Sequence, residues 1–190
     1  KYLRYERMAR DIGITDYTGQ VDTQLLIDNL IFTSAKPYEP INIGMKADDA
    51  ANWFGVAPPD LSLSAREKGV TWIYHYLHGF YADNTRPFGA NNVLVPGVAM
   101  PNVLAHLQGR VVAPDHQSLS LSSLLLVEPG TMSEHQFDRS IQDLVTFLAY
   151  ASEPIKKTRM AMGWYVLFFL LIFLVVAWCL KENYWKEVKK

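Results

Sequence analysis

The stretch Met160–Leu180, MAMGWYVLFFLLIFLVVAWCL, contains 21 residues and no charged side chain. Between Met162 and Leu180, 18 of the 19 residues are apolar, and Gly163 is the exception. At about 1.5 Å of rise per residue, a helix of this length extends roughly 31 Å, which matches the hydrocarbon core of a bilayer. The sequence therefore predicts one membrane-spanning helix in its C-terminal part.

Aromatic residues lie at both ends of this stretch, where the membrane–water interfaces favour them. They are Trp164, Tyr165, Trp178, Tyr184 and Trp185. The alternative is a buried core helix, but ordinary core helices contain some small or polar residues and few reach this length. A secretory signal peptide would lie at the other end of a chain.

Charge changes sign at the same point. The whole sequence has a net charge of -1 and a mean hydropathy of +0.00. Residues 1–155 hold 11 Lys+Arg and 17 Asp+Glu, a balance of -6, whereas residues 156–190 hold 7 and 2, a balance of +5. We interpret the chain as an acidic globular domain joined to a basic-flanked anchor, which excludes a basic nucleic-acid binder. Three basic residues precede the span and four follow it, which leans slightly toward a C-terminus inside the cell.

The acidic part has the pattern of a mainly helical domain with long loops. We expect short helices over residues 1–13, 25–32, 60–68 and 71–81, the last of them ending near Gly79, and a longer helix that stops before Pro154. The sequence Thr131-Met132-Ser133-Glu134 has capping-box spacing ahead of this longer helix. Its apolar face holds Phe137, Ile141, Leu144, Val145 and Leu148. Residues 33–59 and 82–98 are expected to be mostly loop, and residues 110–113 and 121–127 to form a hairpin around Pro114 and Asp115.

Few residues carry the usual signs of catalytic or metal chemistry. Cys179 is the single cysteine and lies in the predicted span, so these 190 residues hold no thiolate zinc site, disulfide framework or thiol nucleophile. His75 and His78 share a helix face, but no acid lies near them in the sequence, and we interpret them as packing or surface residues. A phosphate loop and a nucleophile elbow are both missing from the sequence, so nothing favours a hydrolase.

The most unusual segment is Asn91–Pro101, NNVLVPGVAMP, in which Met100 lies at the end of an extended loop. Met100 lies between Pro96-Gly97 and Pro101, so its backbone is stiff. Most methionines fill gaps in apolar cores, and that is the simpler interpretation. The alternative is a soft thioether presented by a fixed loop to a haem iron, as in c-type cytochromes.

Four motifs carry a resemblance to a known family. They are Lys1–Met8 (KYLRYERM), Ala57–Ser62 (APPDLS), the Met100 loop, and Phe147–Pro154 (FLAYASEP) ahead of a single span. In this order they resemble the cytochrome c1 family, the membrane-anchored haem subunit of ubiquinol–cytochrome c reductase (complex III), in its bacterial form. The resemblance implies a class I c-type cytochrome-like haem domain, mainly α, with long loops and one C-terminal transmembrane helix.

The resemblance also implies roles for individual residues. Met100 would be an axial ligand of the haem iron. Four residues would line the haem crevice, namely Pro58, Pro59, Val98 and Pro101. Trp72 and Tyr76 match apolar or aromatic pocket positions, and Lys68, or alternatively Arg66, stands where the family pairs a cation with a haem propionate.

The family attaches its haem c covalently through a Cys-x-x-Cys-His motif whose His is the second axial ligand. These 190 residues hold no such motif, because Cys179 is alone. In the family the motif lies immediately ahead of the stretch that matches Lys1–Arg4, so we expect it, and a signal peptide, upstream of Lys1. The alternative, which explains the sequence as it stands, is a cofactor-free single-pass accessory subunit of a membrane complex.

By this resemblance the protein carries electrons and does not catalyse a reaction on its own. It would take them from the Rieske iron–sulfur protein and pass them to a soluble or membrane-tethered cytochrome c, beside cytochrome b in a dimeric complex. We expect residues 1–155 to form a periplasmic haem domain, residues 156–181 the anchor in a bacterial inner membrane, and residues 182–190 a basic cytoplasmic tail. The acidic balance of residues 1–155 would suit a basic cytochrome c.

Overall fold

The computed structural model describes residues 2–114 and 119–188. Most of the regular structure is helical, as the sequence predicts. The elements in chain order are α1 (Tyr5–Ile12), α2 (Thr23–Leu30), α3 (Ala47–Phe54), η1 (Leu61–Leu63), α4 (Ser64–Glu67), α5 (Val70–His78), β1 (Phe80–Ala82), β2 (Ala90–Asn92), α6 (Ala105–Gln108), β3 (Gly109–Val112), η2 (Leu121–Ser123), β4 (Leu125–Pro129), α7 (Glu134–Ser152) and α8 (Lys156–Val188). They divide into two compact units, residues 1–153 and 154–190.

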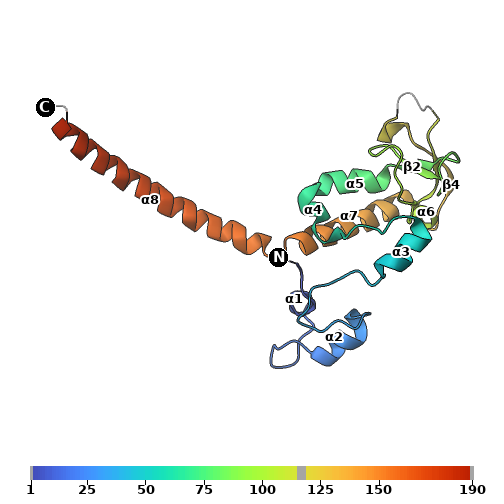
Figure 1. Cartoon of the computed structure of the whole chain (residues 1–190), viewed down its shortest axis with the longest axis horizontal. Coiled ribbons are helices and arrows are strands. Elements are labelled where there is room, and N and C mark those ends of the chain that lie inside the picture. The colour runs from blue at the N-terminus through green and yellow to red at the C-terminus, as the bar shows by residue number, and fades with distance from the viewer. Residues whose placement is uncertain (1, 115–118, 189–190) are drawn as a thin grey trace. The chain divides into compact units, whose positions relative to one another are not determined.

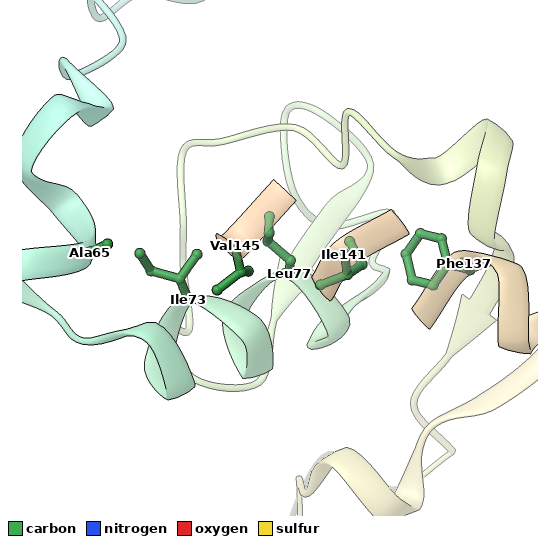
Figure 2. Packing of buried hydrophobic residues seen from close by; sticks show 6 residues of the cluster. All are labelled: Ala65, Ile73, Leu77, Phe137, Ile141 and Val145. Carbon is green, nitrogen blue, oxygen red and sulfur yellow. The ribbon is translucent and has the colours of Figure 1, made fainter. Parts of the chain in front are cut away.

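The main core of the first unit lies between α5 and α7, which run side by side (Figure 1). Figure 2 shows Ala65, Ile73 and Leu77 opposite three residues of α7, namely Phe137, Ile141 and Val145. The three α7 residues are four positions apart, so they lie along one face of the helix. Leu144 and Leu148, predicted on this same face, are less buried, and Leu144 is 38% exposed.

A second core joins the first two helices. Tyr5 and Ala9 from α1 pack with Leu26 of α2. The left-handed Gly13 ends α1 at the predicted position. Helix α2 starts two residues earlier than predicted because the carboxylate of Asp22 caps it, accepting from the backbone N–H of Leu25.

Two antiparallel hairpins complete the unit. Strand β3 pairs with β4, which confirms the predicted hairpin, although Asp115 in its predicted turn lies outside the described residues. Strand β1 pairs with β2, with Phe80 opposite Asn92. The sequence predicted neither strand: β1 follows the helix end expected near Gly79, and β2 lies in the expected loop. Helix α5 ends at Gly79, and the chain turns into a strand immediately after it.

Two further local predictions need correction. Helix α3 lies within residues 33–59, which were expected to be mostly loop, and the left-handed Gly55 ends it. The capping box of α7 is formed by Ser133 and Gln136, not by Thr131 and Glu134, so this helix begins two residues later than the spacing indicated. The predicted cap at Asp60 is present, but it opens the short turn η1 ahead of α4.

The second unit is a single long helix, α8. It holds a stretch long and apolar enough to cross a membrane, Lys156–Lys186, as the sequence predicts. Its 33 residues extend roughly 50 Å, which exceeds a hydrocarbon core of about 30 Å. The helix therefore continues through residues 182–188, which the sequence assigned to a separate tail.

Candidate functional site

Met100 lies on the loop that follows β2, and its side chain is half-buried. The hydroxyl of Tyr76 donates a hydrogen bond to its sulfur, with an Oη–Sδ distance of 3.4 Å. Burial raises the pKa of the Tyr76 hydroxyl, so this group stays protonated and remains a donor at neutral pH. The hydrogen bond engages one lone pair of the thioether sulfur, and the second lone pair is left for coordination of a metal ion.

The position of Tyr76 follows from the periodicity of α5. Ile73 and Leu77 are buried against α7, and Trp72 and Tyr76 each come one position earlier on a neighbouring face. The two rings stack, with centroids 5.0 Å apart and an interplanar angle of 11°. The edge of this pair is closed by Phe80, whose ring lies 5.2 Å from that of Tyr76. An aromatic wall thus stands beside the Met100 sulfur.

Two buried asparagines tie the Met100 loop to its surroundings. Asn92 donates from Nδ2 to the carbonyl of Tyr76 at 2.7 Å. Its Oδ1 accepts from the backbone N–H groups of Leu94 and Val95 at 2.9 and 3.3 Å. Asn91 accepts from the N–H of Gly97 at 2.8 Å. Both residues belong to the segment singled out from the sequence, but neither was given a role, and adjacent asparagines, which strands disfavour, did not indicate a strand.

Asp83 fixes the orientation of Asn91. Its Oδ2 accepts from Asn91 Nδ2 at 2.9 Å, and its Oδ1 accepts from both the hydroxyl and the N–H of Thr85. These bonds, first that of the Thr85 hydroxyl and then that of Asn91, lower the pKa of the Asp83 carboxyl to about 2. The carboxylate is therefore ionised throughout the neutral range and holds the amide of Asn91 in one orientation.

Two features of the structure require glycine at position 97. Its φ of +81° lies in the left-handed region, where residues with a Cβ are strained. In addition, a Cβ at this position would lie only 2.3 Å from Nη2 of Arg86, whose guanidinium lies beside the glycine. The Nε of Arg86 is buried and has no hydrogen-bond partner among the described residues. Only glycine fits here without moving the arginine.

The structure brings some of the predicted site residues together and leaves others apart. Trp72, Tyr76 and Met100 form one group, and Val98 and Pro101 are half-buried on the same loop. The remaining four, Pro58, Pro59, Arg66 and Lys68, are exposed. Lys68 pairs with Glu67 at 3.2 Å, and within residues 2–114 and 119–188 no hydrogen bond or ion pair joins these four to the Met100 loop.

The exposed segment around Pro58 and Pro59 is rich in large apolar side chains. Trp53 and Val56 are 65% and 64% exposed, and Leu61 and Val70 are also exposed. These side chains are available to a ligand, but no hydrogen bond or ring contact among the described residues joins them to Met100. The fit is carried by the soft thioether beside the stacked rings of Trp72 and Tyr76, which suits a large, flat, apolar group that carries a soft-ligand metal, and these residues therefore fit a haem.

The two histidines considered from the sequence are placed differently. His78 lies against Asp138, with Nε2 and Oδ1 3.4 Å apart, and Tyr74 donates to the same carboxylate. The acid that the sequence lacked nearby thus comes from α7, 60 positions later. Among the described residues no cluster of three or more His, Cys, Asp or Glu could hold a metal ion.

The structure also contains an open cavity of about 470 Å³, which does not include Met100. Tyr81 and Ala90 line it, as do Arg110 and Glu128, which form an ion pair. It touches the site only through Pro101, the residue after Met100. We therefore assign the candidate site to the Met100 loop and not to this cavity.

A mainly helical domain that presents a methionine thioether on a pinned loop, followed by a helix able to cross a bilayer, has the features of a membrane-anchored electron carrier of the c-type cytochrome class. Comparison with known proteins gives the particular family. The chain matches the profile of the Cytochrome C1 family over residues 28–188.

Three known proteins also align over most of the chain. The chain is 44% identical to a cytochrome c1 of Allochromatium vinosum, over 99% of the chain and 77% of the relative. It is 37% identical to the ammonia monooxygenase gamma subunit of Nitrosomonas europaea, over 98% of the chain and 75% of that protein. It is 30% identical to a cytochrome c1 of Rhodospirillum rubrum, over 76% of the chain and 55% of the relative.

The chain therefore belongs to the cytochrome c1 family. It is an electron-transfer subunit of the bc1 complex (complex III), a membrane complex that also contains cytochrome b and the Rieske iron–sulfur protein, and the family implies a c-type haem. This favours the electron carrier over the cofactor-free accessory subunit.

The pKa of Asp83 predicts a pH-dependent contribution to stability. Because the pKa is lowered from 3.8 to about 2 in the folded chain, the ionised carboxylate stabilises the fold above about pH 4. This contribution is lost as the pH falls from about 4 toward 2. We expect Asp83→Asn to lower the free energy of unfolding at pH 7 and to have a diminishing effect toward pH 2.

The measurement is denaturant unfolding of the full chain in detergent at several pH values. Thr85→Val, which removes the strongest donor to Asp83, should reproduce part of the effect. A difference between Asp83→Asn and the parent that stays constant from pH 7 to pH 2 would contradict this account.

Proposed function

We propose that Met100 is an axial ligand of the iron in a c-type haem held by residues 1–155. The observation that carries this proposal is the geometry of the thioether, which is half-buried on a pinned loop with one lone pair engaged by Tyr76. When bound, the haem supplies an iron that accepts and returns one electron. The chain supplies its ligand, its apolar surroundings and its attachment to the membrane.

In this proposal Tyr76 acts on the sulfur in two ways. Its hydrogen bond orients the side chain of Met100, so that the free lone pair points away from the hydroxyl. The same bond draws electron density from the sulfur, which weakens its donation to an oxidised iron. The first effect aids ligation, and the second favours the reduced state and holds the potential high, as methionine ligation does in c-type cytochromes.

We propose that the haem crevice is lined by Pro58, Pro59, Val98 and Pro101, with Trp72 and Tyr76 as its aromatic wall. The support is the exposed apolar segment around the two prolines, because contact with a porphyrin would remove it from water at about 25 cal/mol for each Å². Lys68, or alternatively Arg66, is the proposed partner of a haem propionate. Both are exposed, and Lys68 would exchange its ion pair with Glu67 for the propionate.

We propose that the haem is attached covalently through a Cys-x-x-Cys-His motif outside residues 1–190. The one cysteine of these residues, Cys179, lies in α8, so the two thioether bonds need cysteines from elsewhere. The histidine of that motif would be the second axial ligand.

We propose that the haem domain faces the periplasm, with the anchor at residues 156–181 in a bacterial inner membrane and residues 182–190 in the cytoplasm. The slight excess of basic residues after the span supports this orientation. The electron then passes to a soluble or membrane-tethered cytochrome c, and the complex is a dimer. The charge of -6 on residues 1–155 supports a basic acceptor.

The ligand role of Met100 is tested by Met100→Leu in the assembled complex. Leucine keeps the apolar volume but cannot bind iron, so the haem midpoint potential should fall by about 0.1 V or more, because axial ligands set haem potentials over roughly 0.8 V. Redox titration measures it. Met45→Leu, at an exposed position in another loop, serves as the control. An unchanged potential in Met100→Leu would refute the assignment.

The choice between Lys68 and Arg66 is tested by replacing each with alanine. The true propionate partner places a positive charge near the iron, so its loss should lower the potential by tens of millivolts, roughly what one charge exerts at about 10 Å in a solvent-exposed setting. Redox titration of the two variants in parallel distinguishes them. No change in Lys68→Ala together with a shift in Arg66→Ala would assign the role to Arg66.

The charge of the acceptor is tested by the salt dependence of electron transfer. Reduction of a basic cytochrome c by the reduced complex should slow about tenfold or more between roughly 0.01 M and 0.15 M salt, because screening removes electrostatic steering. Stopped-flow absorbance gives the rate. A small anionic oxidant should show the opposite trend. A rate for cytochrome c that does not depend on salt would contradict the proposal.

A further inference from the structure

The two asparagines of β2 are buried far more deeply than their polarity favours. Asn92 has no exposed surface and Asn91 is 9% exposed. A buried amide is costly unless each donor and acceptor finds a partner. Here the partners are backbone groups of the Met100 loop and of α5, together with Asp83. The burial is thus compensated by bonds to the segment that carries Met100.

Asn92 ties the first part of the loop to α5. Its Nδ2 binds the carbonyl of Tyr76, and its Oδ1 accepts from Leu94 and Val95. The same Tyr76 donates its hydroxyl to Met100 Sδ. One residue of α5 is thereby bonded to both ends of the loop, through its carbonyl at the start and through its hydroxyl at Met100.

Asn91 ties down the second part. Its Oδ1 accepts from the N–H of Gly97, three residues before Met100, and its Nδ2 is held by Asp83. The guanidinium of Arg86 lies beside the same glycine. Between them, the two asparagines engage the N–H groups of three of the four residues 94–97, and the fourth is Pro96, which has none.

We propose that Asn91 and Asn92 are positioning residues for Met100, which hold the backbone of residues 94–97 so that the thioether stays on the haem iron. This inference rests on the proposed ligand role of Met100. A loop without regular secondary structure has many accessible conformations, and only a small part of them places Sδ correctly. The asparagine bonds remove the other conformations before any ligand is bound, which is preorganisation of the ligand.

A purely structural role makes a different prediction. If the asparagines only stabilise the hairpin, their loss should lower the melting temperature and leave the haem unchanged. If they position Met100, their loss should increase the fraction of iron from which the sulfur has dissociated. A competing ligand such as imidazole then binds the ferric haem more tightly in proportion to that fraction.

The experiment uses Asn91→Ala and Asn92→Ala in the assembled, haem-loaded complex, with Met100→Leu alongside. We expect both asparagine variants to weaken the charge-transfer absorption band of methionine-ligated ferric haem and to shift the midpoint potential in the same direction as Met100→Leu. Imidazole affinity should rise about tenfold, as a rise in the dissociated fraction from roughly 1% to 10% requires. Amide hydrogen exchange at Leu94, Val95 and Gly97 should become faster.

The matched control is Leu26→Ala, which opens a cavity in the separate core between α1 and α2 and destabilises the fold without touching α5, the Met100 loop or the two asparagines. It should lower the melting temperature and leave the band, the potential and the imidazole affinity at their parent values. If Asn92→Ala fails to fold, the less buried Asn91→Ala decides. A folded Asn91→Ala with the parent's band and imidazole affinity overturns the inference.

The failure of the underlying ligand role looks different. In that case Met100→Leu itself would keep the band and the potential of the parent, and the inference would fall with the ligand assignment. If Met100→Leu loses the band while Asn91→Ala keeps it, the ligand role stands and only the positioning role is overturned.

Discussion

The arrangement of the site depends on one residue whose polar groups are all engaged. Tyr76 lies in the last turn of α5, where carbonyls lack helical partners, and its carbonyl accepts from both Gly79 and Asn92. Its hydroxyl donates to Met100. The position of Tyr76 is in turn set by Ile73 and Leu77, which pack on α7 and turn the neighbouring face toward the loop. The packing of α5 on α7 thereby determines where the Tyr76 hydroxyl meets the sulfur of Met100.

The two units of the chain suit different surroundings, and their charge and hydropathy differ accordingly. The first unit buries apolar side chains in three small clusters and carries an excess of acidic groups. The apolar side chains of α8 are exposed, which is stable only if lipid or another membrane protein surrounds them. For a member of the cytochrome c1 family this separation joins an acidic electron-transfer domain to a helix that can cross a membrane.

The sequence predicted those parts of the fold that depend on local signals. Gly13 ends α1, Pro154 limits α7, and the apolar stretch of α8 is long enough to be recognised by itself. It failed where structure depends on distant partners. Strands β1 and β2 are three residues each, and β2 is made of residues that strands disfavour. Asp138 comes to His78 from 60 positions away, and no spacing rule could place it there.

The site divides in the same way. Met100 stood out by its loop, but its ligand role came from the family resemblance, and the resemblance also supplied the other proposed crevice residues. Asn91 and Asn92 were in view as part of an unusual segment, yet their bonds depend on the pairing of β1 with β2, which the sequence did not indicate. Because successive residues of a strand point to opposite faces, these two neighbours can act in opposite directions. Asn91 reaches Asp83 and Gly97, and Asn92 reaches Tyr76 and Leu94. Two adjacent amides in a strand can thus connect one loop to two different parts of the domain.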